Sequence, residues 1–223
     1  MTPNQFINHG AIDSLIFDMD GTLWDAVDSY AVIWNVTLDQ LGIEHQIVTR
    51  EDLLRLMGSY LDDILQKLIP NVDQRAKVLE LTMLNEASMM PTLGGNLYPD
   101  VRQTLNSLKQ NYKLFMVSNC GPQGLENFVA YNALEGCFTD LLSHGGTGKS
   151  KAENIAYLID KYQLKSPVYV GDTQGDADQA HAAGIPFIWA SYGFGQVDNP
   201  DAKLLSFTQI KEAISSINKN LIS

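Results

Sequence analysis

The sequence predicts an α/β protein: a doubly wound, Rossmann-like and mostly parallel sheet that carries an inserted all-helical domain. Short apolar runs have the length of buried strands, and patterns typical of amphipathic helices separate them. Strands that alternate with helices in this way are typical of a parallel sheet covered by helices on both faces. One long interval near the N-terminus contains helical patterns alone, which indicates a second domain inserted into the first.

The predicted core strands are continuous apolar runs, as expected for strands that are buried on both faces. They lie at residues 15–17, 114–117, 168–170 and 186–189, with a weaker run at 141–142. Helical patterns cover residues 101–110, 126–132, 152–162 and 176–183. Ligands of such sheets bind beyond the carboxyl ends of the strands, so the residues after each run are the candidates for function.

The inserted domain is predicted to span residues 26–90. It contains helical patterns at 30–41, 50–57, 61–69 and 73–90, and Gly42, Gly58 and Pro70-Asn71 separate them. We expect one hinge near residues 23–26 and the return near 91–99, where Pro and Gly cluster. Residues 1–25 and 91–223 then form the Rossmann-like catalytic core.

The composition is ordinary for a soluble globular protein. The 223-residue chain is 45% hydrophobic and 18% charged, and its formal net charge of -11 would repel nucleic acid and anionic membranes. The N-terminal residues lack a signal-peptide pattern, and no segment has the length of a membrane span. Cys120 and Cys137 form no zinc-binding pattern, and reduced thiols are the simpler interpretation. We expect a cytoplasmic monomer or weak homodimer with no nucleic-acid or membrane partner.

Acidic residues follow two of the predicted strands. The first strand leads into Asp18-Met19-Asp20-Gly21-Thr22, and the strand at 168–170 leads through Gly171 into Asp172, with Asp176 four residues later. Because parallel strands end at one edge of the sheet, Asp18, Asp20 and Asp172 can converge on a hard cation, and such an oxygen-rich set suits Mg²⁺. The first motif alone also fits an acidic turn, and Asp176 is a candidate either for the metal site or for a helix cap.

Ser118-Asn119 follows a further strand at the same edge. A serine hydroxyl and the backbone N–H groups at a helix start can hold phosphoryl oxygens, although the pair alone also fits an ordinary turn.

The stretch from Ser143 to Ser150, SHGGTGKS, looks similar to a nucleotide-binding P-loop. That pattern requires glycine at the position of Ser143, so we expect the glycines to form a flexible connection between a strand and a helix.

Four motifs, taken in their order along the chain, resemble those of the haloacid dehalogenase-like hydrolase superfamily. They are "DMDGT" at residues 18–22, Ser118-Asn119, a lysine before a helix, and "GDTQGD" at residues 171–176. The helical block after the first motif is similar to the small cap of the phosphoglycolate phosphatase and β-phosphoglucomutase-like branch. The resemblance implies that Asp18 attacks phosphorus and that Asp20 serves as general acid and base. It further implies that Asp18, the Asp20 carbonyl and Asp172 hold magnesium, that Ser118 binds the phosphoryl group, and that Thr22 and Asn119 shape the loops around it.

The resemblance also implies an active-site lysine, for which Lys149 and Lys151 are both candidates. Lys151 is preferred because it directly precedes a helical pattern, whereas Gly148-Lys149 matches a different form of the motif. Arg55 is a candidate substrate contact on the inserted domain, or else a solvated helix charge.

The expected function is a Mg²⁺-dependent phosphatase that hydrolyses a small phosphorylated metabolite through an aspartyl-phosphate. The alternatives are a sugar phosphomutase of the β-phosphoglucomutase type, which would use the same residues, and a non-catalytic module that binds a phosphorylated ligand.

Overall fold

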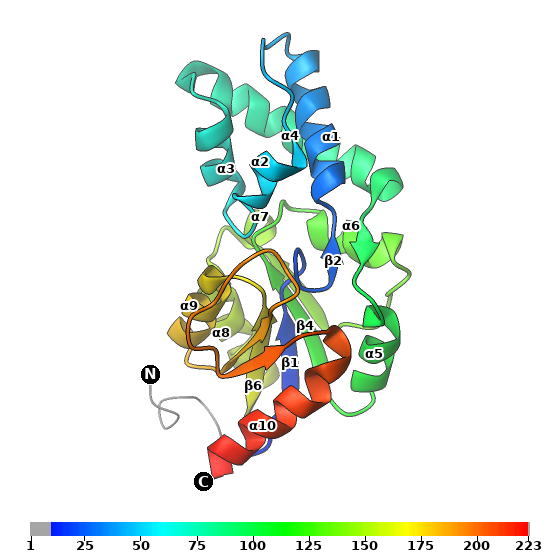
Figure 1. The fold of residues 1–223 in the computed structure, drawn as a ribbon, viewed down its shortest axis with the longest axis vertical. Helices are drawn as coiled ribbons and strands as arrows, with labels where there is room; N and C mark the ends of the chain where they lie inside the picture. Colours follow the sequence, from blue (N-terminus) through cyan, green and yellow to red (C-terminus); the bar gives the residue numbers. More distant parts are fainter. Residues whose placement is uncertain (1–9, 223) are drawn as a thin grey trace.

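A computed structural model describes residues 10–222; residues 1–9, which the sequence assigns to the core, lie outside the described part. The core is a six-stranded parallel sheet (Figure 1), which confirms the predicted fold class. Its order is β5 (Asp140–Ser143), β4 (Lys113–Ser118), β1 (Ser14–Phe17), β6 (Pro167–Gly171), β7 (Phe187–Ala190) and β8 (Ala202–Leu204). Phe17 of β1 pairs with Met116 of β4 and Val170 of β6, so these central strands end at nearly the same level.

Helices cover both faces of the sheet because successive strand residues point to opposite sides. Leu15 and Phe17 pack toward α5 (Val101–Leu108) and α10 (Ile210–Ile222), whereas Ile16 packs toward α8 (Lys151–Tyr162) and α9 (Gln174–Ala182). The helix α6 (Gly124–Tyr131) contributes Leu125 and Phe128 to the first of these cores.

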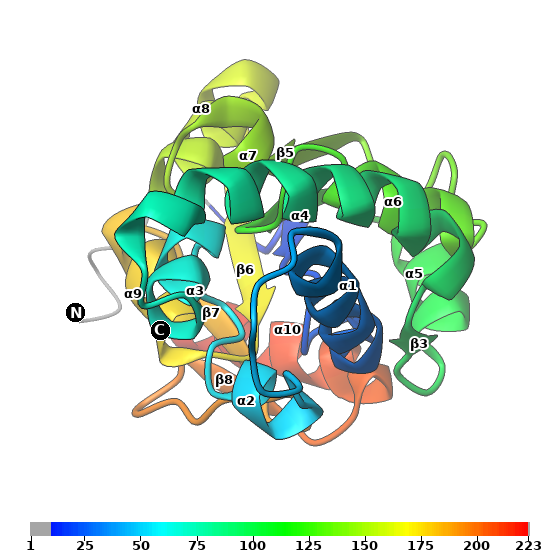
Figure 2. The same cartoon turned by 90° about the horizontal axis from the view of Figure 1, so that it is seen from above.

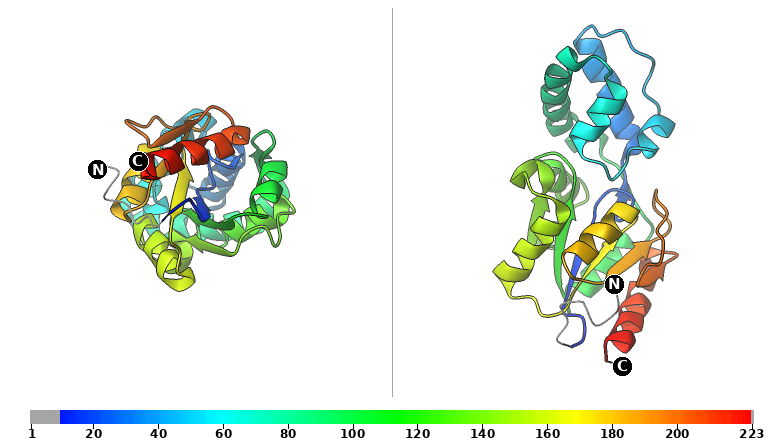
Figure 3. Two further views of the ribbon diagram at one scale, coloured as in Figure 1. Left: turned by 90° about the horizontal axis from the view of Figure 1, so that it is seen from below. Right: turned by 90° about the vertical axis from the view of Figure 1, so that its left-hand side faces the viewer.

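A separate helical unit lies beyond the carboxyl ends of the strands (Figures 1 and 3). It consists of α1 (Val27–Gln40), α2 (Arg50–Leu54), α3 (Leu61–Leu68) and α4 (Val72–Leu93), and it has an apolar core of its own. Seen from above, α4 extends across the unit beside α1 (Figure 2). A short antiparallel ribbon of β2 (Trp24–Asp25) and β3 (Asn96–Leu97) joins this unit to the core.

Two local predictions differ from the structure. The last helix of the unit continues through Pro91 to Leu93, and Gly94 ends it with a φ of 58°. The loop SHGGTGKS, expected to be a flexible connection, contains the short helix α7 (His144–Thr147). Its N-terminus is capped by the Ser143 hydroxyl, which accepts a hydrogen bond of 3.0 Å from the Gly146 N–H.

Within residues 10–222, no helix combines the length and the apolar character needed to cross a bilayer.

Candidate active site

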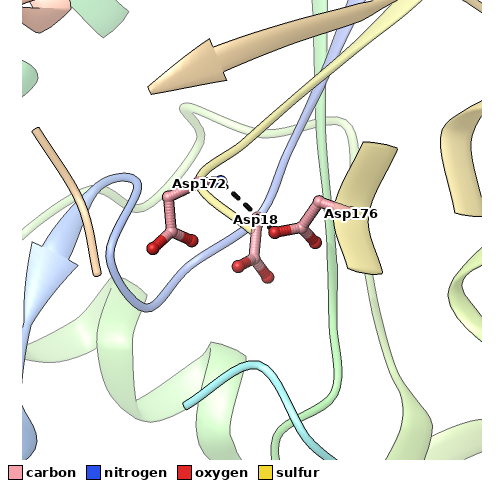
Figure 4. A group of neighbouring side chains, drawn as sticks. All are labelled: Asp18, Asp172 and Asp176. Atoms are coloured by element: carbon pink, nitrogen blue, oxygen red, sulfur yellow. Dashed lines mark hydrogen bonds between the residues drawn. The ribbon is translucent and has the colours of Figure 1, made fainter. Parts of the chain in front are cut away.

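Three buried aspartates come together where β1 and β6 end (Figure 4). Asp18 directly follows β1, Asp172 directly follows β6, and Asp176 lies in the first turn of α9. One carboxylate oxygen of each lies within 4.8 Å of the others. Ser118, the last residue of β4, and Thr22 are also buried and lie at this edge of the sheet.

Lys151 supplies a buried positive charge to this group. Its Nζ donates to Asp18 Oδ1 at 2.8 Å and to Asp176 Oδ1 at 2.6 Å, and its side chain is only 3% exposed. Lys151 is the first residue of α8, and a capping box formed by Ser150 and Glu153 fixes where this helix begins.

Lys149, the other candidate lysine, is exposed and lies over the ring of Tyr157, 5.5 Å from its centroid. The geometry therefore brings Lys151 to the aspartates and leaves Lys149 outside the site.

Asp176 contacts the site and also completes a capping box at the start of α9, where Thr173, and not Asp176, is the N-cap residue. Its Oδ2 accepts hydrogen bonds from the Thr173 hydroxyl at 2.7 Å, from the Thr173 N–H at 3.0 Å and from the Asp172 N–H at 3.2 Å. Its Oδ1 accepts the bond from Lys151. Asp176 therefore takes part in capping α9, and its side chain orients both Lys151 and the loop that carries Asp172.

The site has an excess of negative charge. Burial raises the pKa of Asp18 to about 6, although Lys151 lowers it. Burial, Asp176 and Asp18 together hold the pKa of Asp172 well above its usual range. Burial disfavours the charged form of Lys151, but Asp176 and Asp18 outweigh this and raise its pKa. A divalent cation would relieve the repulsion among these carboxylates.

Three polar atoms at this edge are buried and have no hydrogen-bond partner among residues 10–222: Thr22 Oγ1, Asn119 Oδ1 and Asp172 Oδ1. Asp172 Oδ2, by contrast, accepts a bond of 2.7 Å from the Phe194 N–H. Because an unpaired buried oxygen is costly, such atoms are expected to meet a ligand. The unpaired Asp172 oxygen and the adjacent carboxylates have the hard-oxygen chemistry that Mg²⁺ prefers.

Asp20 lies in a different environment from Asp18. Its Oδ1 accepts a hydrogen bond of 3.1 Å from Trp24 Nε1. Burial and the neighbouring charge of Asp18 raise the pKa of Asp20 to about 8, while hydrogen bonds from Trp24 and Tyr30 lower it. A carboxyl group with this pKa carries a proton at neutral pH and can donate it.

Gly21 is required by the close approach of the first loop to Asp172. Its φ is 78°, and a Cβ at this position would stand 2.1 Å from Asp172 Oδ2. Any side chain here would displace the Asp172 carboxylate.

A pocket lies above these residues, between the core and the helical unit. The core contributes Asp18, Asp20, Ser118, Asn119 and Lys151 to its lining. The helical unit contributes a mostly apolar wall, which includes Trp34, Leu53, Met57, Leu61 and Ile64.

The helical unit contacts the core directly beside this pocket. The Asn119 amide donates to the Gly58 carbonyl at 2.8 Å, and the rings of Tyr60 and His144 lie with their centroids 4.2 Å apart. The pocket is therefore roofed by the helical unit in this arrangement.

The sequence analysis missed most of the pocket residues of the helical unit, among them the titratable side chains of Tyr30 on α1 and Glu86 on α4. The sequence pattern could have identified Glu86, because it lies in a four-residue spacing with Val78, Thr82 and Met90, which are all buried on one face of α4. A charged residue on the inner face of a helix is a candidate for function. Arg55, in contrast, is exposed and is absent from the pocket lining, so the structure does not bring it to the other candidates.

Comparisons with known proteins agree with this geometry. The model of the haloacid dehalogenase-like hydrolase family matches residues 15–190, which include every core residue named above for the pocket. A phosphoglycolate phosphatase from Aliivibrio fischeri is 28% identical over 197 residues, covering 82% of this chain and 86% of that protein. A phosphoglycolate phosphatase from Vibrio parahaemolyticus is 26% identical over 223 residues, covering 92% of this chain and 96% of that protein.

Solved structures share the fold. A haloacid dehalogenase-like family hydrolase from Streptococcus pneumoniae superimposes with a TM-score of 0.80 at 19% identity, covering 90% of this chain and 97% of that one.

Proposed function

Because the chain belongs to the haloacid dehalogenase-like hydrolase family, we propose that it is a Mg²⁺-dependent phosphatase that hydrolyses a small phosphorylated metabolite through an aspartyl-phosphate. Membership in this family, together with the phosphoglycolate phosphatases among its relatives, makes the chain a hydrolase of phosphoric monoesters. The cofactor, the covalent intermediate and the roles of individual residues are our proposal.

The observation that carries the proposal is the contrast between Asp18 and Asp20 within one pocket. Asp18 is held by the Lys151 ammonium, which favours the charged, nucleophilic carboxylate. Asp20 has no ion pair among residues 10–222, and burial raises its pKa to about 8. Two neighbouring carboxyl groups whose environments separate their pKa values are suited to act as nucleophile and acid.

In the first step, an Asp18 oxygen forms a bond to phosphorus while the bond from phosphorus to the leaving oxygen breaks. Asp20 gives its proton to that leaving oxygen, which departs as an alcohol. In the second step, water attacks phosphorus, Asp20 takes a proton from the water, and the bond between phosphorus and Asp18 breaks to release phosphate. The same carboxyl group thus serves as acid and then as base.

Other residues bind the phosphoryl group. The Ser118 hydroxyl, which lines the pocket, is suited to donate a hydrogen bond to one of its oxygens. Lys151 lowers the repulsion between the nucleophile and the phosphate, and Asn119 ties the phosphate-binding loop to the helical unit through Gly58.

Mg²⁺ would be held by Asp18, by the unpaired oxygen of Asp172 and by the Asp20 carbonyl, with Asp176 positioning Asp172 and Lys151. When bound, the cation would neutralise negative charge on the phosphoryl oxygens and on the carboxylates around them. The helical unit, which we propose to be a cap domain, would exclude water from this site.

The pocket wall gives less support to the mutase alternative. A sugar presents many hydroxyl groups, whereas the wall over the site is mostly apolar, with Tyr30, Ser59 and Glu86 as its polar side chains. A non-catalytic binding module would not need the separate environments of Asp18 and Asp20.

The test is hydrolysis of p-nitrophenyl phosphate by the purified protein with Mg²⁺ and with EDTA. We expect Mg²⁺-dependent phosphate release that Asp18→Asn abolishes. Asp62→Asn, the same substitution at an exposed position of α3, is expected to keep full activity. No release of phosphate from this ester or from a broad panel of phosphate monoesters would refute the proposal.

A further inference from the structure

Glu86 brings a carboxyl group into the roof of the pocket. It lies on α4 and lines both the pocket over Asp18 and the groove that continues from it between α4 and the segment 120–124. Its Oε2 stands 3.2 Å from where a Cβ on Gly121 would be, so the carboxylate reaches down to the phosphate-binding loop. Among the residues that the helical unit contributes to the pocket, Glu86 alone has an acidic side chain.

The carboxylate of Glu86 has no counter-charge. Within the described residues it forms no ion pair and accepts no hydrogen bond that would fix it, and burial raises its pKa to about 7. Its charge acts on neighbouring groups, because it contributes to raising the pKa of Asp20, Tyr30 and Cys120. A partly buried carboxyl group without a partner is satisfied when a ligand supplies a hydrogen-bond donor or a cation.

The pocket has no cation left for a second anionic group. Among the described residues, Lys151 is the one basic residue in the pocket lining, and Asp18 and Asp176 already form ion pairs with its ammonium. Arg55 is exposed and lies outside the lining. A leaving group that carried a carboxylate would therefore face Glu86 with nothing to neutralise it.

We propose that Glu86 selects the substrate by charge, so that the pocket takes phosphate monoesters with a neutral or cationic leaving alcohol and discriminates against those with a carboxylate beside the ester. A hydroxyl or ammonium group on the alcohol would donate to Glu86, while its carbon atoms would contact the apolar wall at Trp34, Leu53 and Met57. This inference rests on the proposed phosphatase function. The proposed charge preference differs from the substrate that the names of the phosphoglycolate phosphatase relatives indicate for those proteins.

The test compares three esters whose leaving groups have two carbons and differ in charge: 2-phosphoglycolate, 2-hydroxyethyl phosphate and 2-aminoethyl phosphate. We expect the wild-type protein to hydrolyse the last two with a kcat/KM at least roughly tenfold above that for 2-phosphoglycolate, because juxtaposed like charges are strongly unfavourable. In Glu86→Gln, which keeps the shape of the side chain, kcat/KM for 2-phosphoglycolate should rise and that for 2-aminoethyl phosphate should fall. Their ratio should change by about tenfold or more.

The control is Asp73→Asn, the same loss of charge at an exposed position of the same helix, outside both the pocket over Asp18 and the groove that continues from it. It should leave the ratio of the two esters unchanged. The inference would be overturned if the wild-type protein preferred 2-phosphoglycolate. It would also be overturned if the ratio of the two esters changed equally in the two variants.

Hydrolysis of p-nitrophenyl phosphate separates the two proposals. If the wild-type protein hydrolyses it but shows no charge preference among the three esters, the inference on Glu86 fails and the phosphatase stands. If the protein hydrolyses neither p-nitrophenyl phosphate nor any of the three esters, both proposals fail.

Discussion

Replacing Lys151 by methionine tests the charge balance of the site. The Lys151 ammonium lies 2.8 Å from one oxygen of Asp18 and 2.6 Å from one oxygen of Asp176, and all three side chains are almost fully buried. Methionine fills a similar volume but leaves two buried carboxylates without their partner. Removing one member of a buried ion pair costs about 3–5 kcal/mol. For a chain of 223 residues this corresponds to a fall in Tm of roughly 6–20 °C.

The loss of stability caused by Lys151→Met should increase with pH. Lys151 lowers the pKa of Asp18, so its removal raises that pKa further above the value in the unfolded chain. A group whose pKa is raised on folding stabilises the protein less as the pH increases through the folded value. We therefore expect Lys151→Met to be more destabilising at pH 8 than at pH 5, measured as Tm by circular dichroism in EDTA.

Lys149→Met is the matched control, because Lys149 is exposed and distant from the aspartates. Its free energy of unfolding should change by no more than about 0.5 kcal/mol. Lys151→Met should also lose at least about 100-fold in kcat with p-nitrophenyl phosphate. The reasoning would be refuted if Lys149→Met lost as much activity or stability as Lys151→Met, or if Lys151→Met melted at the wild-type temperature at both pH values.

Three further predictions follow from the loops around the site. Asp172→Asn removes a carboxylate from the cluster, so the Mg²⁺ concentration for half-maximal hydrolysis of p-nitrophenyl phosphate should rise at least roughly tenfold; an unchanged titration would argue against Asp172 as a ligand. Gly58→Ala, at a φ of 81°, would place Cβ 3.1 Å from Thr173 Cγ2 and should lower kcat/KM about fivefold. The control is Gly42→Ala, at a φ of 62° with open space around it, which should leave kcat/KM unchanged. Equal losses of kcat/KM in the two variants would assign the effect to backbone strain alone. Because Asp20 holds its proton below about pH 8, kcat for alkyl phosphates should fall about tenfold per pH unit above that value; a rate that stays constant to pH 9.5 would contradict its role as the acid.

The positions of Asp18, Asp20 and Asp172 in the fold could be predicted because they follow runs that can only be buried strands. Leu15 to Phe17 and Val168 to Val170 contain no charged residue, and parallel strands bring the residues after them to one edge. The helix α10 was not predicted, although Ile210, Ala213, Ile214 and Ile217 have helical spacing. The strand β8 left almost no signal, since it has three residues and includes an exposed lysine.

Side-chain roles that depend on distant partners could be predicted only in part from local pattern. Lys149 and Lys151 are two residues apart beside a glycine-rich loop, and the helical pattern that follows Lys151 favoured it without identifying the aspartates that it contacts. The difference arises from the start of α8, where the capping box of Ser150 and Glu153 directs Lys151 toward Asp18, 133 positions earlier in the chain.

The sequence by itself determined the fold class, the family resemblance and the order of the acidic motifs, because hydrophobic periodicity and turn chemistry are local properties of the chain. Only the tertiary structure decided which charged side chains form ion pairs and which, among the described residues, do not. It buried Lys151 between Asp18 and Asp176, left Arg55 in solvent and placed Glu86 without a partner over the pocket. The strength of a charge depends on its burial and on the charges packed against it, and these neighbours come from segments far apart in the sequence.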